Sequence, residues 1–241
     1  MNLIVPPAFQ STTKINNQQS STFCYLRHMG RAALCGVILS AGESSRMGTD
    51  KALLPWPPTT PGQASGTFLS ATIRALSDWT DMVIVVAGKN AATLAPVVYT
   101  NGASLVVNPD PTRGQFSSLQ TGLQHILSRG RDAAMVTLVD RPPANATTLE
   151  KLHDAFQTAI ARAKWAVVPE YGGKHGHPIV LGREMIEKFL RAPTTAVARD
   201  IEHQHQDRIE YLPVDDPLVT FNVDTPEEYA KLASFAVSKS G

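Results

Sequence analysis

The sequence predicts a single α/β domain in which helices cover both faces of a mostly parallel sheet. Two observations carry this prediction. Short apolar runs, each suited to a buried parallel strand, recur at residues 35–39, 82–87, 104–107 and 133–139. Between them lie stretches whose apolar residues recur at helical spacing. Such alternation is typical of parallel sheets, because each parallel connection has to cross back over the sheet.

The first half of the chain supplies the clearest elements. After the strand at 35–39, residues 56–66 are rich in Pro, Thr and Gly and predict a mobile loop. A helix is expected over 67–76, and a weaker one over 91–98. Residues 108–114 form a predicted turn that leads into a further helix. The apolar face of that helix consists of Leu119, Leu123, Ile126 and Leu127.

The second half continues the pattern. A helix over 145–160 is expected to bury Leu149, Leu152, Phe156 and Ile160. The later elements are strands at 165–169, 179–181 and 209–214, a hairpin-like turn at 172–173, and helices at 183–190 and 195–205. Thr225 and Pro226 start a last helix, since Pro suits the first turn and Glu227 and Glu228 suit the positive end of the helix dipole.

Composition limits the partners and the compartment. The formal net charge is +1 and no basic run is present, which argues against nucleic acid and anionic membrane surfaces as partners. No apolar run is long enough to span a bilayer. The two cysteines, Cys24 and Cys35, lack metal-ligand spacing, and so few cysteines favour a reducing, cytoplasmic location.

The first 30 residues differ from the rest. They are rich in Ser, Thr, Asn and Gln, show no periodicity, and lack the basic start and apolar centre of a signal peptide. We expect residues 1–30 to be a disordered extension or a mis-annotated start, with Met29 as the natural beginning. The domain would then occupy residues 31–241.

A polar, glycine-containing loop after the first strand is the strongest functional signal. It contains Gly42, Gly48, Arg46 and Lys51. Backbone N–H groups of such loops bind anions, glycine lets the backbone approach a phosphate, and both cations can grip phosphate oxygens. The spacing fits neither a Walker loop nor the dinucleotide fingerprint G-x-G-x-x-G. The loop therefore predicts a triphosphate site of another type; the alternative is an ordinary surface loop.

This loop resembles the nucleotide signature of the MobA-like NTP transferases, L-x-x-G-x-x-x-R-x-G-x-x-K-x-L-x-P. The matching residues are Leu39, Gly42, Arg46, Gly48, Lys51, Leu53 and Pro55. The resemblance implies a Rossmann-like nucleotidyltransferase domain and assigns nucleotide binding to Leu39, Ser40, Ala41, Gly42, Arg46, Gly48 and Lys51. A second family segment matches at Asn108, Gly114, Ser118, Leu119 and Gly122, which implies that Asn108 and Ser118 help to hold base and ribose. A capped helix without a ligand is the alternative for Ser118.

Two aspartates complete the resemblance. Asp140 follows a predicted strand, and the family motif Gly-Asp-x-Pro is retained except that Val139 replaces the glycine. Asp224 precedes Thr225-Pro226, as does the family's second metal ligand. The resemblance implies that both carboxylates bind one Mg²⁺, an ion that takes one or two carboxylates plus phosphate oxygens. The alternatives are a turn or cap residue for Asp140 and an N-cap for Asp224.

Within the family, two features resemble the cytidylyltransferase branch. Ser40-Ala41-Gly42 stands where the guanylyltransferase branch has Ala-Gly-Gly, and Gly176-His177-Pro178 matches a segment lining the acceptor pocket. The resemblance implies CMP transfer from CTP to molybdopterin, catalysed by Arg46, Lys51, Asp140 and Asp224, with His177 binding substrate or serving only the structure. A molybdoenzyme or its maturation chaperone would take the product. A guanylyltransferase, a sugar-phosphate nucleotidyltransferase and a non-enzymatic nucleotide sensor remain alternatives.

Overall fold

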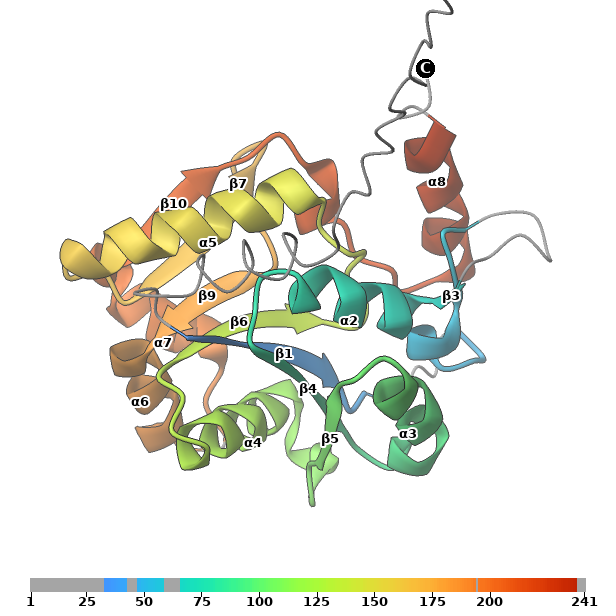
Figure 1. Ribbon diagram of the computed structural model, residues 1–241, viewed down its shortest axis with the longest axis horizontal. Helices are drawn as coiled ribbons and strands as arrows, with labels where there is room; N and C mark the ends of the chain where they lie inside the picture. Colours follow the sequence, from blue (N-terminus) through green and yellow to red (C-terminus); the bar gives the residue numbers. More distant parts are fainter. Residues whose placement is uncertain (1–32, 43–46, 59–65, 194, 238–241) are drawn as a thin grey trace, which may run out of the picture. The chain divides into compact units, whose positions relative to one another are not determined.

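The computed structural model describes residues 33–42, 47–58, 66–193 and 195–237 (Figure 1). The expected extension at 1–30, Cys24 and Arg46 lie outside the described residues. The main sheet has the strand order β10-β7-β9-β6-β1-β4-β5, with β8 paired to β7. One half of the sheet consists of β1 Leu34–Ser40, β4 Met82–Ala87, β6 Ala133–Leu138 and the edge strand β5 Ser104–Val107. The other half consists of β7 Ala166–Tyr171, β8 Lys174–His175, β9 Ile179–Gly182 and β10 Ile209–Pro213.

The sheet is mostly parallel, as the sequence predicts. β1 pairs in parallel with β4 and β6, β4 with β5, and β7 with β10. Two strands depart from this direction: β9 runs antiparallel to both β6 and β7, and β8 runs antiparallel to β7. The expected turn at Gly172 and Gly173 is confirmed as the β7–β8 hairpin, where both glycines have positive φ, a conformation that costs glycine little.

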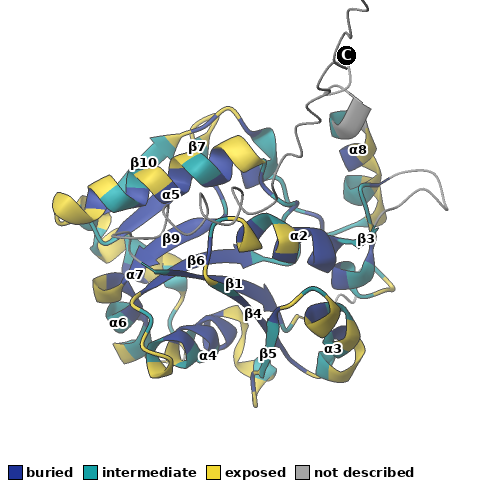
Figure 2. Ribbon diagram, viewed as in Figure 1, coloured by how far each residue is buried: buried dark blue, intermediate teal, exposed yellow. Residues whose placement is uncertain are grey.

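Helices cover both faces of the sheet (Figure 1). The core on one face joins the strands to α2 Phe68–Ser77, α3 Ala91–Thr100 and α5 Ala146–Ala161. The core on the other face joins them to α4 Gln115–Ser128, α6 Arg183–Arg191 and α7 Ala198–Gln204. Side chains of β1 alternate between the two cores, Ile38 facing one and Val37 the other. The strands are therefore buried on both sides, whereas the helices expose their outer faces (Figure 2).

Close packing brings α4 onto the sheet. A Cβ at Gly122 would lie 2.9 Å from Val86 Cγ2 and 3.0 Å from Val37 Cγ1. Only a residue without a side chain allows the helix to approach β1 and β4 this closely. Ser118 lies one turn earlier on α4, so this contact also sets the position of Ser118 relative to the end of β1.

Three expectations need correction. Ile160 was expected inside but is 45% exposed, because Ala159 takes the core position after Phe156 on α5. α7 begins at Ala198 and not at residue 195. The loop expected over 56–66 includes a short hairpin between β2 Pro55–Trp56 and β3 Gly66–Thr67, while residues 59–65 lie outside the described part.

Short 3-10 helices and a last α-helix complete the described part of the chain. They are η1 Lys51–Leu53, η2 Pro111–Arg113, η3 Gln206–Arg208, η4 Pro217–Thr220 and α8 Pro226–Val237. A satellite core of Leu54, Phe68, Val223 and Leu232 packs α8 against η1 and α2. Among the described residues, no helix combines the length and the apolar character that a bilayer span requires.

Candidate active site

The candidate site lies at the carboxyl ends of β1, β4 and β6. The register pairs Leu39 with Leu138 and Ser40 with Ala87, so the segments that follow these strands emerge at one edge of the sheet. The connections leaving β1 and β5 pack on opposite faces, since α2 belongs to one core and α4 to the other. Open α/β sheets bind ligands at such a reversal of strand order, beyond the carboxyl ends of the strands.

The described part of the glycine loop begins at Ala41 and Gly42. A Cβ at Gly42 would meet no protein atom within 4 Å, so its small size leaves room on the ligand side. Gly48 has φ +66°, a backbone conformation that favours glycine. Ser40 is 1% exposed, and its Oγ has no hydrogen-bond partner.

An unpredicted network fixes the position of Lys51. Asn90 Nδ2 donates to Ser40 O at 3.0 Å and to Asp50 Oδ2 at 2.7 Å. Asp50 Oδ1 in turn accepts from Ala52 N at 3.0 Å and caps η1. The ends of β1 and β4 are thereby tied to the first residue of η1, which is Lys51. Polar residues just after β4 were the available sequence signal for Asn90.

Lys51 brings the two predicted metal ligands together. Its Nζ lies 2.6 Å from Asp224 Oδ1 and 3.9 Å from Asp140 Oδ2, although Lys51 and Asp224 are 173 positions apart in the chain. The backbone supports the same convergence, because Val223 N donates to Asp140 O at 2.9 Å. The Asn222 amide donates to the other oxygen of Asp224. The fold thus holds one cation and two carboxylates in one cluster.

The cap alternatives for the two aspartates are not supported by their contacts, whereas Asp140 does lie in a turn, closed by Arg141 N donating to Leu138 O at 3.1 Å. At the start of α8, Thr225 Oγ1 accepts from Glu228 N at 3.3 Å, so Thr225 and not Asp224 acts as the cap. Glu228 Oε2 accepts from the backbone N–H groups of Asp224 and Thr225 at 2.6 and 3.0 Å. Asp140 Oδ1 is buried without a hydrogen-bond partner, and the nearby helix α5 is capped by Asn145. Neither carboxylate caps a helix, so both are available to the charged cluster with Lys51.

The electrostatics of Asp140 reflect its surroundings. Burial raises the pKa of Asp140, while Lys51 and Arg141 oppose the rise. A buried carboxylate oxygen without a partner is costly unless a cation or donor meets it. Among the described residues, no three His, Cys, Asp or Glu side chains gather as a metal site. Two carboxylates fit Mg²⁺, which completes its shell with water and ligand phosphate oxygens.

A cavity of about 190 Å³, called here the smaller cavity, adjoins the glycine loop. It is lined by Leu39, Ala41, Gly42, Pro111, Gly114, Gln115 and Ser118. Asn108 is buried behind it and does not line it. Its Nδ2 donates to the hydroxyls of Ser117 and Ser118 at 2.9 Å each. Because the Ser118 oxygen accepts from Asn108, its own proton is available for a ligand.

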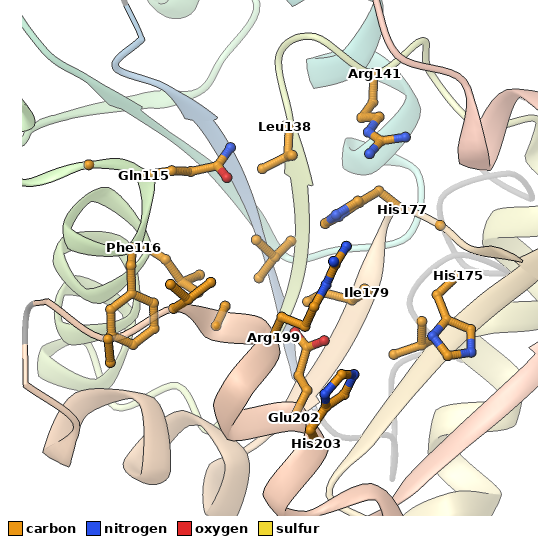
Figure 3. A pocket seen from close by; sticks show the side chains of 18 of the residues that line it. Gln115, Phe116, Leu138, Arg141, His175, His177, Ile179, Arg199, Glu202 and His203 are labelled. Carbon is orange, nitrogen blue, oxygen red and sulfur yellow. The ribbon is translucent and has the colours of Figure 1, made fainter.

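A second cavity of about 610 Å³, called here the larger cavity, shares Gly114 and Gln115 with the smaller one. Apolar walls come from Phe116, Leu138 and Ile179, and polar groups from Arg141 and His177 (Figure 3). Burial lowers the pKa of His177 to about 4, and the charge of Arg141 acts in the same direction. His177 is therefore neutral near pH 7, and its Nδ1 is buried without a partner. His175, in contrast, is exposed and stacks on Tyr211 with ring centroids 4.1 Å apart.

Of the predicted site residues, Leu39, Ala41, Gly42 and Ser118 line the smaller cavity, and His177 lines the larger one. Lys51, Asp140 and Asp224 form the charged cluster. Asp50, Asn90 and Arg141 were not predicted. A linear motif search does not find them, since their relevance depends on the side chains they meet across the sheet edge.

Comparison with known proteins agrees with this geometry. The model of the MobA-like NTP transferase domain matches residues 36–209. The molybdenum cofactor cytidylyltransferase of Escherichia coli (strain K12) is 23% identical over 202 residues, covering 82% of this chain and 94% of that protein. The probable molybdenum cofactor guanylyltransferase of Rhodopirellula baltica is 33% identical over 130 residues, covering 54% of this chain and 59%, less than two thirds, of that relative.

Solved structures agree as well. The crystal structure of Rv0371c from Mycobacterium tuberculosis H37Rv superposes with a TM-score of 0.68 at 27% identity, covering 84% of this chain and 99% of that one. The family model spans more than half of the sequence and includes the glycine loop, Asp140 and His177. This chain therefore belongs to the MobA-like NTP transferase family.

Proposed function

We propose that this protein is a molybdenum cofactor cytidylyltransferase, which transfers CMP from CTP to the phosphate of a molybdopterin-type acceptor and releases pyrophosphate. The observation that carries the proposal is the meeting of Lys51, Asp140 and Asp224 at the sheet edge that also holds the glycine loop. Two cavities with a shared wall lie at this edge, one for each substrate.

The reaction needs charge control and positioning more than a covalent nucleophile. An acceptor phosphate oxygen bonds to the α-phosphorus, the bond from that phosphorus to the β-phosphate oxygen breaks, and pyrophosphate leaves with the electron pair. Lys51, Arg46 and loop N–H groups around Gly42 and Gly48 bind the β- and γ-phosphates. Asp140 and Asp224 would hold Mg²⁺, which would supply Lewis-acid stabilisation of the phosphate oxygens.

The choice of CTP rests on the smaller cavity. Ala41 lines it, and an alanine at this position takes up more room than a glycine would. Less space favours a pyrimidine over a purine. Ser118 offers its hydroxyl proton to the base or ribose, while Asn108 holds that hydroxyl from behind. The Escherichia coli cytidylyltransferase also aligns over most of this chain.

A guanylyltransferase is the second candidate, because the Rhodopirellula baltica relative has the higher identity over a shorter region. The product would pass to a molybdoenzyme or its maturation chaperone. We also propose a cytoplasmic reaction, in keeping with the free, buried thiol of Cys35.

The test is pyrophosphate release with molybdopterin and Mg²⁺, measured separately for CTP, GTP, ATP and UTP. We expect release with CTP, and a loss of about 100-fold or more in kcat/KM for Asp140→Asn. The matched control is Asp132→Asn, an exposed aspartate at the opposite edge of the sheet, which should keep full activity. Release with GTP alone would assign the chain to the guanylyltransferases. NTP binding without turnover on molybdopterin or a sugar 1-phosphate would favour a sensor.

A further inference from the structure

Arg141 stands between the charged cluster and the larger cavity. It directly follows Asp140 and lines the cavity together with His177. Figure 3 shows its guanidinium on the same side of the cavity as the imidazole of His177. In the motif Asp-x-Pro, Arg141 occupies the variable position, so the family resemblance assigns it no role.

Arg141 makes few of the hydrogen bonds that its guanidinium can donate. Nη1 donates to Phe221 O at 3.3 Å, and Nε is buried without a partner. Within the described part of the chain, no carboxylate lies within ion-pair distance of its guanidinium, although the charges of Asp140 and Asp224 favour its charged form from farther away. A partly buried arginine normally pairs with an anion or a full set of acceptors, because its desolvation is costly. These contacts indicate a group that receives an anion from outside the protein.

A second polar atom faces the same cavity without a partner. His177 Nδ1 is buried and makes no hydrogen bond. The nearby walls from Val136, Leu138 and Ile179 carry apolar side chains, and the Val136 backbone gives the His177 ring its one hydrogen bond there, which leaves Nδ1 without a partner. Other polar side chains, among them Gln115, Arg199 and Glu202, also line the cavity. Arg141 Nε and His177 Nδ1 are buried without a partner, and two such groups mark a place where the polar end of a ligand fits.

We propose that Arg141 binds the phosphate of the acceptor substrate, with His177 as a hydrogen-bonding neighbour, and so directs the attacking oxygen toward the α-phosphate. This inference rests on the proposed nucleotidyl transfer. A planar guanidinium can hold a phosphate through two parallel hydrogen bonds, which fixes its orientation as well as its position. It also offsets the repulsion between two phosphates that have to meet beside Asp140 and Asp224.

The positions of Lys51 and Arg141 assign the two cations to different substrates. Lys51 contacts the carboxylate cluster and follows the glycine loop, on the nucleotide side. Arg141 lines the larger cavity and is absent from the walls of the smaller one. Loss of Arg141 should therefore weaken acceptor binding and leave nucleotide binding intact.

The experiment uses the full chain, with CTP, Mg²⁺ and molybdopterin. Arg141→Gln is expected to raise KM for molybdopterin by at least about tenfold. The Kd for CTP, measured by calorimetry without acceptor, should stay unchanged. Arg141→Lys keeps the charge but loses the planar fork, so its KM for molybdopterin should lie between those of wild type and Arg141→Gln. The control is Arg183→Gln, an exposed arginine at the opposite edge of the sheet.

A purely structural role gives a different result. If Arg141 only anchors the backbone at Phe221, both variants lower the melting temperature and leave KM for molybdopterin unchanged, which overturns the proposal. An equal loss of CTP binding also overturns it.

Binding of inorganic phosphate, followed by ³¹P NMR without turnover, separates this inference from the proposed function. Arg141-dependent phosphate binding in a protein that does not turn over supports the anion site and rejects the transfer reaction. Turnover and phosphate binding that are both unaffected by Arg141→Gln reject the anion site alone.

Discussion

His177 illustrates how burial sets the chemistry of one residue. Its pKa is lowered to about 4 because burial disfavours the charged ring and Arg141 adds a like charge. The neutral ring is suited to hydrogen bonding within the larger cavity near pH 7. The sequence left open whether His177 binds substrate or serves only the structure. Its unpartnered Nδ1 is the observation that favours contact with a ligand.

This shift predicts a pH dependence of stability. Below pH 6.5 the unfolded chain binds a proton at His177, and the folded chain does so only near pH 4. Stability should therefore fall as the pH drops through this window. At pH 4.5 the shifted pKa of His177 alone should lower the free energy of unfolding by about 2.5 kcal/mol. The measurement is urea unfolding at pH 7 and pH 4.5 for wild type and His177→Gln.

Between pH 7 and pH 4.5, His177→Gln should lose about 2.5 kcal/mol less unfolding free energy than wild type. His203→Gln, which changes an exposed histidine, should behave as wild type. Equal acid sensitivity of wild type and His177→Gln would show that the ring is not the origin of the effect.

At the scale of elements, the network around Asn90 joins three separate segments. Asn90 stands at the N-cap position of α3 but makes no side-chain cap there. Its amide instead connects the end of β1 to Asp50, which caps η1. The element that carries Lys51 is thereby held against the two strands at the centre of the sheet.

Asn90→Ala should weaken this arrangement. We expect a loss of about 1–2 kcal/mol in unfolding free energy, because Ser40 O and Asp50 lose a donor. Kd for CTP should rise several-fold, since Lys51 follows Asp50 directly. The control is Asn101→Ala, which removes a comparable amide bond to Val97 O at the far end of α3. If both variants lose stability and both keep CTP affinity, the network does not position Lys51.

Elements also show what local pattern can and cannot predict. The strands β4 and β5 have the predicted bounds, because their apolar runs end at clear turn residues. Ile160 was placed wrongly, since a periodic pattern near a helix end fits two neighbouring faces and only packing selects one. The antiparallel direction of β9 depends on the hairpin that leads into it and on its two neighbours.

At the scale of the whole molecule, the candidate site joins distant parts of the chain. Residues following β1, β6 and η4 meet at one sheet edge through Lys51, Asp140 and Asp224. α8 packs on the satellite core around Leu54 and Phe68, so Asp224 is attached to the same region as η1. A ligand that bridges these segments should stabilise the fold as a unit.

CTP with Mg²⁺ is therefore expected to raise the melting temperature. At about 100 times Kd, linkage gives about 2.7 kcal/mol, which is roughly 5–10 °C for a domain of this size. The measurement is thermal unfolding monitored by circular dichroism. Asp224→Asn should remain folded but lose most of the shift, and EDTA should do the same to wild type. An unchanged shift in both cases would contradict binding through the carboxylate cluster.

The sequence by itself determined the α/β architecture, the family and most of the candidate site. Alternating apolar runs report burial directly, and the loop from Leu39 to Lys51 is a continuous motif that keeps its spacing whatever surrounds it. Asp140 and Asp224 were found because each follows an apolar stretch within a recognisable segment.

Tertiary structure alone decided how these residues meet. It placed Lys51 between the two aspartates, Asn108 behind Ser118, and Arg141 with an unused donor beside His177. Such relations join residues up to 173 positions apart. They depend on strand order and register, which bring distant segments to one edge of the sheet and leave no signal in the spacing of residues along the chain.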